Sequence, residues 1–121
     1  MMSFSRCLLL PVLLFCMTAC VAPREHRLIE SRYASGSIPA IKELGQSKKP
    51  VSHEQLKELI DQLESDDSAV RIFAAEALEK LTGSTRDYDY YDDDTDRQKA
   101  VDDWRAWLSA QPDPYYPMSS R

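Results

Sequence analysis

The sequence is poor in several residue types on which common functional sites depend. Its 121 residues include no asparagine, two histidines and three glycines. Gly36, Gly45 and Gly83 lie far apart, so the chain has no glycine-rich loop that binds phosphate or a dinucleotide. Basic residues are outnumbered too: 15 Lys and Arg accompany 20 Asp and Glu, a net charge of -5. This charge argues against nucleic-acid binding, and the length allows one small domain.

Residues for catalysis are equally scarce. Neither His26 nor His53 lies in a metal-binding pattern such as H-E-x-x-H, and no serine has the context of a catalytic triad. The abundant carboxylates lack the apolar surroundings that separate the pKa values of an acid–base pair. We therefore expect a protein that is not an enzyme, with no cofactor and no small-molecule substrate.

The apolar run from Cys7 to Met17 is too short to cross a membrane as a permanent helix, which takes about 20 residues. It follows the basic Arg6 and leads into small residues, an order typical of a secretory signal. Cys16 also lies in this run and no cysteine follows Cys20, so the chain has no disulfide framework. These features predict a signal peptide over 1–19, with an ordinary secretory signal or an uncleaved anchor as alternatives.

The end of this segment, Met17-Thr18-Ala19-Cys20, resembles the lipobox of bacterial lipoproteins. In that family small residues precede a cysteine that receives lipid and becomes the first residue of the mature chain, and Leu usually stands where this chain has Met17. The resemblance implies that Cys20 is the lipid attachment site of an exported, membrane-anchored protein. Val21 is not the aspartate that favours inner-membrane retention in the family, which implies the outer membrane, facing the periplasm.

The composition divides the rest of the chain into a linker, a domain and a tail. Residues 20–51 are predicted to form a lipid-anchored linker that is basic at its start, at Arg24, Arg27 and Arg32. Within it, 38–45 has an early proline, apolar residues at helical spacing and a terminal glycine, which predicts a short helix. Residues 52–110 are expected to form a helical domain, and the proline-rich residues 111–121 a disordered tail.

Three helices are predicted in the domain. Ser52 and Gln55 form a capping-box pattern before an apolar stripe at helical spacing. Asp67 can cap a second helix, which ends at Gly83. A third helix is predicted to start with a second capping box and to have one apolar face. The first stripe is Leu56, Leu59, Ile60 and Leu63, the second capping box is Thr95 and Gln98, and the last face is Ala100, Val101, Trp104, Trp107 and Leu108.

The second of these helices resembles a known repeat. Asp67-Ser68-Ala69-Val70-Arg71, followed by an alanine-rich stretch and Leu81, is similar to the second helix of a HEAT-like repeat of the short bacterial type related to the phycobilisome lyase group. The match covers Ser52 to Gly83. It implies that the aspartate caps the helix, the arginine braces the neighbouring turn and small alanines let helices approach closely. The repeat residues are Asp67, Val70, Arg71, Ala74, Ala77 and Leu78.

A solenoid needs about three such repeats to share a core, and this chain has one. We therefore predict an all-α fold, in which a short HEAT-like hairpin is closed by the third helix with its two tryptophans. Each tryptophan can bury a large apolar area.

The loop before the third helix is unusual, because six of the ten residues from 87 to 96 are Asp and three are Tyr. One interpretation is an acidic, aromatic surface for a basic partner, and another is a solvated loop whose tyrosines pack on the hairpin. The candidate partner surface comprises Tyr88, Tyr90, Tyr91, Trp104 and Trp107. A weak alternative is calcium binding, because Asp87-x-Asp89 begins like an EF-hand loop, but the Gly and Glu of that motif are missing. The ligands in that case would be Asp87, Asp89 and Asp92.

Together these patterns predict an envelope lipoprotein held in the membrane by its N-terminal lipid, whose helical domain binds an unidentified protein. The alternative is a structural lipoprotein that binds cations such as calcium loosely and associates with copies of itself.

Overall fold

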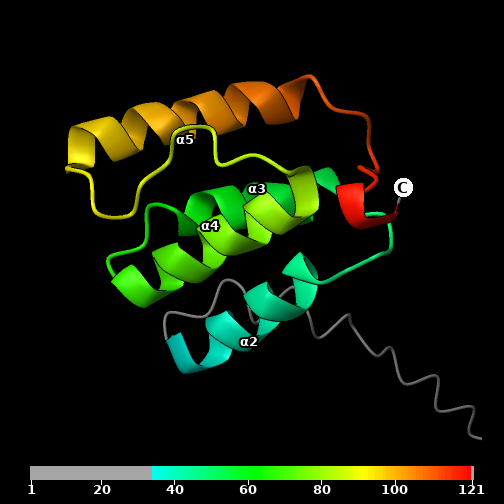
Figure 1. Cartoon of the computed structure of the whole chain (residues 1–121), viewed down its shortest axis with the longest axis horizontal. Coiled ribbons are helices and arrows are strands. Elements are labelled where there is room, and N and C mark those ends of the chain that lie inside the picture. Colours follow the sequence, from blue (N-terminus) through cyan, green and yellow to red (C-terminus); the bar gives the residue numbers. More distant parts are fainter. Residues whose placement is uncertain (1–33, 121) are drawn as a thin grey trace, which may run out of the picture.

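The computed structural model describes residues 34–120, and within this range it contains four α-helices and no strand (Figure 1). They are α2 (Ala34–Gly45), α3 (His53–Gln62), α4 (Ser68–Thr82) and α5 (Asp94–Ser109), followed by the short 3-10 helix η1 (Met118–Ser120). The prediction of an all-α fold is confirmed.

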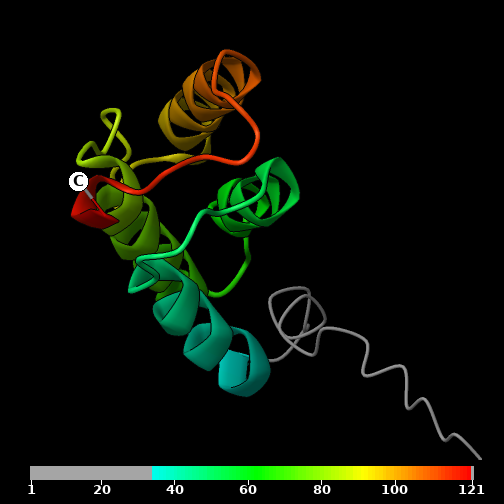
Figure 2. The same cartoon turned by 90° about the vertical axis from the view of Figure 1, so that its right-hand side faces the viewer.

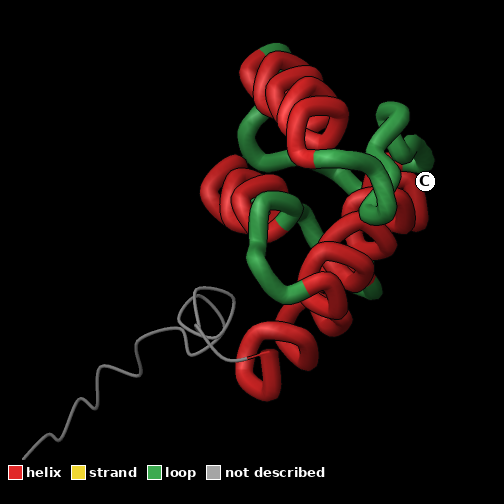
Figure 3. The backbone as a smooth tube through the Cα atoms, turned by 90° about the vertical axis from the view of Figure 1, so that its left-hand side faces the viewer, coloured by secondary structure: helices red, strands yellow, loops and turns green. Residues whose placement is uncertain are grey.

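The helices form two layers (Figure 2). In one layer α2 packs against α4, and in the other α3 packs against α5; α3 also packs against α4, which joins the layers. Figure 3 shows the irregular segments from the opposite side: the connection from α4 to α5 reaches the level of α5, and the C-terminal end lies beside α4. Beside α5, the layer formed by α2 and α4 therefore continues as irregular chain and not as a helix.

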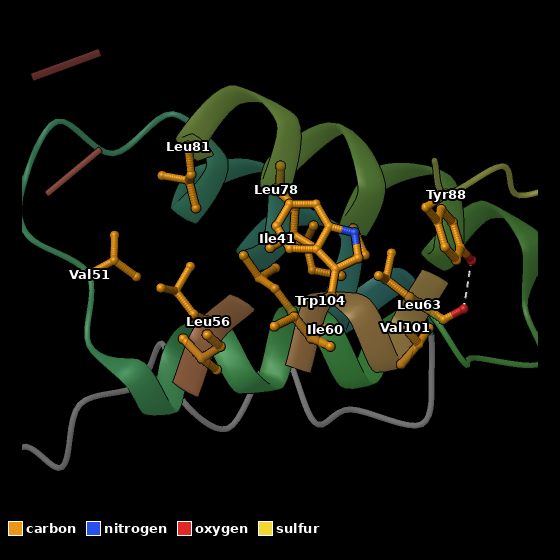
Figure 4. Packing of buried hydrophobic residues seen from close by; sticks show 14 of the residues in the cluster. Ile41, Val51, Leu56, Ile60, Leu63, Leu78, Leu81, Tyr88, Val101 and Trp104 are labelled. Atoms are coloured by element: carbon orange, nitrogen blue, oxygen red, sulfur yellow. Dashed lines mark hydrogen bonds between the residues drawn. The ribbon is translucent and has the colours of Figure 1, made fainter. Parts of the chain in front are cut away.

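The start of α3 has the predicted capping box. The hydroxyl of Ser52 accepts a hydrogen bond from the Gln55 backbone N–H at 3.2 Å, and the Gln55 side chain accepts one from the Ser52 N–H at 3.1 Å. The apolar stripe of this helix faces α4 and α5 in the core (Figure 4). All four of its members are fully buried: Leu56, Leu59, Ile60 and Leu63.

The first turn of α4 is fixed by the two polar side chains that the repeat resemblance names. Asp67 caps the helix by accepting a hydrogen bond from the Ala69 N–H at 2.8 Å. Arg71 donates through Nη1 to the carbonyl oxygens of Ser65 at 2.7 Å and Asp66 at 3.3 Å, which ties α4 to the turn that follows α3. At these two residues the expected roles of cap and brace are present.

Small residues allow α2 and α4 to approach closely. Ala74 and Ala77 of α4 are buried, together with the repeat residues Val70 and Leu78. A Cβ atom added to Gly45 would lie 2.8 Å from both Cα and Cβ of Ala77, so at this contact any larger residue would push the helices apart. Glycine is therefore required here for packing.

Helix α5 starts at a different cap from the predicted one. Asp93, not Thr95, is the N-cap: its carboxylate accepts hydrogen bonds from the N–H groups of Thr95 at 2.9 Å and Asp96 at 3.0 Å. The predicted capping box of Thr95 and Gln98 is wrong, because an aspartate two residues earlier caps equally well and its charge also favours the positive end of the helix. Gln98 donates instead to Asp102 at 3.1 Å.

Residues 38–45 belong to the folded domain, not to the linker in which they were predicted. Helix α2 begins at Ala34, one turn earlier than the pattern suggests, and Ile41 is fully buried in the core shared with α4. Ser37, which comes directly before the predicted helix, is a buried residue inside α2. The reason is tertiary: packing on α4 supplies stability that the local signals of a short helix do not.

The C-terminal segment is ordered where the structure describes it, so the prediction of a disordered tail is wrong there. Val51 and Tyr115 form an isolated antiparallel bridge with two backbone hydrogen bonds of 2.8 Å. Tyr115 is buried, and its ring meets the ring of Trp107 edge-on at a centroid distance of 5.4 Å. The prolines do prevent a helix, but burial of Tyr115 and Pro117 compensates for the entropy of ordering the segment.

Candidate interaction surface

Two residues of the predicted partner surface are core residues. Trp104 of α5 is 1 % exposed, and Tyr88 is buried with its hydroxyl donating a hydrogen bond to the carbonyl oxygen of Leu63 at 2.7 Å (Figure 4). Burial raises the pKa of the Tyr88 phenol above its ordinary value. The loop thus uses Tyr88 to pack on the hairpin, and neither residue is available to a partner.

Tyr90 and Tyr91 remain on the surface of the loop. Tyr91 is 82 % exposed, and the two rings lie against each other with centroids 4.3 Å apart. The interaction with the neighbouring Tyr91 side chain is the main cause of the raised pKa of Tyr90. The carboxylate of Asp89 accepts from the Tyr91 N–H at 2.8 Å, so the turn is held locally and presents Tyr91 to solvent.

Trp107, the fifth predicted residue, forms a half-buried aromatic site at the C-terminal half of α5. Its ring meets Trp104 edge-on at 5.4 Å, and the guanidinium of Arg86 lies over both rings, 4.9 Å from Trp107 and 5.2 Å from Trp104. A cation over an indole face is attracted by the quadrupole of the ring. Arg86 therefore attaches the loop between α4 and α5 to the two tryptophans.

The backbone at this point is unusual. Arg86 has φ 51° and the next residue, Asp87, has φ 57°, a left-handed conformation that is disfavoured in residues other than glycine. The Nε–H of Arg86 is buried with no hydrogen-bond partner among the described residues. Two successive strained residues persist only where the surroundings compensate for them, and here the stacking of Arg86 on the tryptophans provides that compensation.

An open pocket of about 490 Å³ lies next to this stack. Its walls come from the loop after α4 and from one face of α5: Ser84, Thr85, Arg86, Asp87, Asp103, Ala106 and Trp107. The carboxylates of Asp87 and Asp103 are exposed, and neither has a hydrogen bond or an ion pair within the described part of the chain. The pocket therefore combines one indole, one guanidinium and two unpaired carboxylates.

The carboxylates of the loop are spread out in the described structure. In residues 34–120 no group of three or more His, Cys, Asp and Glu side chains is placed to hold a metal ion. The calcium alternative at Asp87, Asp89 and Asp92 is therefore not supported by their geometry. The loop carboxylates cap local turns instead, as Asp89 does for Tyr91 and Asp93 does for α5.

An ion-pair cluster joins the outer faces of α3 and α5. Arg105 donates to Asp61 at 3.1 Å and to Glu64 at 2.5 Å, and the hydrogen bond to Glu64 is the main cause of its raised pKa. Lys57 pairs with Asp61 at 2.7 Å, which raises the pKa of the lysine. The side chains of the cluster are largely exposed, so it contributes little to the stability of the fold.

The sequence pointed to Trp107 but missed Arg86, Asp103 and the C-terminal contacts. A pairing such as Arg86 with Trp107 joins residues 21 positions apart on different elements, and no helical or strand period relates them. The left-handed conformation also had no clear sequence signal, because of the two residues only Asp87 is of a type enriched there and neither position is a glycine.

Comparison of the chain with protein-family models, with curated proteins and with solved structures finds no match. Cys20 and the predicted signal peptide 1–19 lie outside the described residues. Within 34–120 none of the helices has the length and apolar character needed to cross a membrane.

Proposed function

We propose that this protein is a lipid-anchored module of a bacterial cell envelope that binds another protein through its helical domain. Support for the anchor comes from the short apolar run and from Met17-Thr18-Ala19-Cys20, with Cys20 as the lipid attachment site. Val21 supports the outer membrane, with the domain on the periplasmic side. Two-chain or three-chain lipidation holds a protein stably, whereas a single chain does not.

The observation that favours binding by the domain is the surface formed by Arg86, Trp107 and the C-terminal segment. Arginine, tryptophan, tyrosine and methionine are enriched at protein–protein interfaces. Arg86 lies over half-buried Trp107, and the C-terminal segment, which contacts Trp107 through Tyr115, exposes Tyr116 and Met118. Met118 lies 3.7 Å from the position that a Cβ on Gly83 would take, close to the pocket. The anchor would raise the local concentration of this surface near membrane partners.

The anchor is tested by labelling. Cells that produce the full chain are grown with radiolabelled palmitate, and we expect label in the wild-type protein and none in Cys20→Ala. The variant should also keep its signal peptide, because the lipid-dependent cleavage cannot occur. A wild-type protein without label, or a variant processed like the wild type, would contradict the anchor.

Binding is tested by photo-cross-linking in the same cells. A photoreactive amino acid replaces Ala106, which is exposed in the pocket wall, and a control replaces Glu79, which is exposed on α4. We expect a covalent adduct at position 106 and a much weaker one at position 79. An adduct of twice the mass of the chain would instead indicate self-association, the alternative function. No adduct at position 106, with the protein produced at normal amounts, would contradict binding through this surface.

A further inference from the structure

The pocket beside Trp107 contains the charged groups that determine what it can bind. Asp87 lies at its loop side and Asp103 on α5, and both carboxylates are exposed and unpaired within the described residues. We infer that this pocket binds a lysine or arginine side chain in a basic segment of the partner protein, with Asp87 and Asp103 as the acceptors. The inference rests on the proposed function and names the chemistry of its partner.

Charge favours a cation over an anion at this site. The pocket has two carboxylates and one guanidinium, and the guanidinium of Arg86 already lies against two indole rings. The surrounding domain adds to the negative potential, because residues 34–120 contain 18 Asp and Glu and 10 Lys and Arg. A ligand carboxylate would approach Arg86 against this potential, whereas a basic side chain would be attracted by it.

The walls also suit the shape of a basic side chain. Lysine and arginine have a long methylene stem, which packs on apolar surface while the charged group stays near water. Ala106 and the half-buried ring of Trp107 supply such a surface on α5, next to Asp103. The pocket is open to solvent, so a side chain of a partner can enter it without rearrangement of the helices.

The strained loop fixes one of the two acceptors. The left-handed backbone of Arg86 and Asp87 and the stacking of Arg86 on Trp107 hold Asp87 at the edge of the pocket before any ligand arrives. Groups that are already ordered lose less entropy when they bind. Arg86 is thus a positioning residue, and Asp87 and Asp103 contact the ligand.

The test uses three short peptides that differ in one side chain: acetyl-Leu-Arg-Leu-amide, its citrulline analogue and its glutamate analogue. The full chain is held in detergent micelles, and two-dimensional NMR follows the indole N–H signal of Trp107. We expect a saturable shift with the arginine peptide that weakens as salt is added. The citrulline peptide, which has nearly the same shape without the charge, should bind several-fold more weakly, and the glutamate peptide should not bind.

Three variants with the same change of charge locate the acceptors. Asp87→Asn and Asp103→Asn should each weaken binding of the arginine peptide roughly two- to fivefold, as expected for an exposed ion pair. Asp102→Asn is the matched control, because Asp102 lies on the same helix but pairs with Arg105 at 3.5 Å and is outside the pocket. It should bind the peptide like the wild type. Equal urea midpoints for all three variants show that the fold is kept.

Several results would overturn the inference. Equal binding of the citrulline peptide, tighter binding of the glutamate peptide, or equal weakening by Asp102→Asn would each do so. So would tighter peptide binding after Arg24, Arg27 and Arg32 are changed to Gln, because the chain's own basic segment would then be the occupant. If the cross-link at position 106 persists in Asp87→Asn and Asp103→Asn, the proposed function stands and this inference fails.

Discussion

Tyr88 and Tyr91 belong to the same short loop, yet their side chains have opposite environments. Tyr88 is buried and donates to the Leu63 carbonyl at 2.7 Å, whereas Tyr91 is 82 % exposed. Replacing Tyr88 by Phe leaves that carbonyl without its partner, so we expect a loss of about 1–2 kcal/mol in the free energy of unfolding. Tyr91→Phe is the matched control and should change it by less than about 0.5 kcal/mol. Urea unfolding measures both, and equal losses would contradict the assigned contact.

The same phenol makes stability depend on pH in the alkaline range. Burial raises the pKa of Tyr88 in the folded state. The stability that the neutral phenol contributes is therefore fully present below the pKa of tyrosine in the unfolded chain, near 10. This stability is lost as the pH rises through the higher pKa that Tyr88 has in the folded state. We expect the free energy of unfolding of the wild type to fall more steeply above about pH 10 than that of Tyr88→Phe. Parallel pH profiles would exclude this role, because the other tyrosines are common to both proteins.

A substitution at Gly45 tests how closely α2 and α4 approach each other. Alanine normally stabilises a helix relative to glycine by about 0.5–1 kcal/mol, but here its Cβ would lie 2.8 Å from the backbone of Ala77. Overpacking costs about 1–3 kcal/mol, so we expect Gly45→Ala to destabilise the protein in urea unfolding. Ala106→Gly, at an exposed position of α5, gives the ordinary helix preference and should cost about 1 kcal/mol. A more stable Gly45→Ala protein would show that the helices lie further apart.

At the scale of elements, the C-terminal segment gives a clear pair of variants. Tyr115 is buried between Val51 and Trp107, while its neighbour Tyr116 is 54 % exposed. Tyr115→Ala should lower the free energy of unfolding by about 3 kcal/mol, as for other buried aromatic residues. Tyr116→Ala should lower it by less than about 1 kcal/mol. Similar small losses in both variants would mean that the segment contributes little to the fold.

The elements that could be predicted from sequence are those with local causes. The capping box at Ser52 and the left-handed end at Gly83 depend on residues within one turn, and both are found as predicted. The length of α2 and the order of residues 111–118 depend on contacts with α4 and with Val51, far away in the chain. The start of α5 was predicted wrongly for another reason. Five carboxylates and a threonine lie close together in the sequence there, and several of them can cap a helix.

The candidate site could be predicted only in part, for the same reason. An aromatic surface was expected at five residues, and only Trp107 of these lines the pocket; the others are Tyr88, Tyr90, Tyr91 and Trp104. Sequence spacing places Trp104 and Trp107 on one helix face, but it cannot say which of them a loop will cover. Arg86 covers both rings. Its position depends on the left-handed backbone of residues 86 and 87, and neither of these residues is a glycine that would indicate this conformation.

At the scale of the whole molecule, α4 is the central element and α2 the peripheral one. Helix α4 packs against α2, α3 and η1, whereas α2 packs chiefly on α4. Opening α2 would break its contact with α4 and leave the contacts of α4 with α3 and η1 intact, so α2 can open in a step that does not open α4. We expect amides of α2 around Ile41 to exchange hydrogen more readily than amides of α4 around Leu78, with a weaker dependence on urea.

Gly45→Ala tests whether the amides of α2 exchange by breaking the contact between α2 and α4, because it strains that contact. In native-state hydrogen exchange the variant should lower the opening free energy of α2 amides by nearly the full cost of the substitution. The amides of α4 near Leu78 should lose the same amount, because the strained contact is broken in both open states, so their opening free energy stays above that of the α2 amides in both proteins. If α2 and α4 exchange with one free energy and one urea dependence in both proteins, the domain opens as a single unit. The two-layer arrangement would then be fully cooperative, unlike repeat arrays in which each element depends on its neighbours.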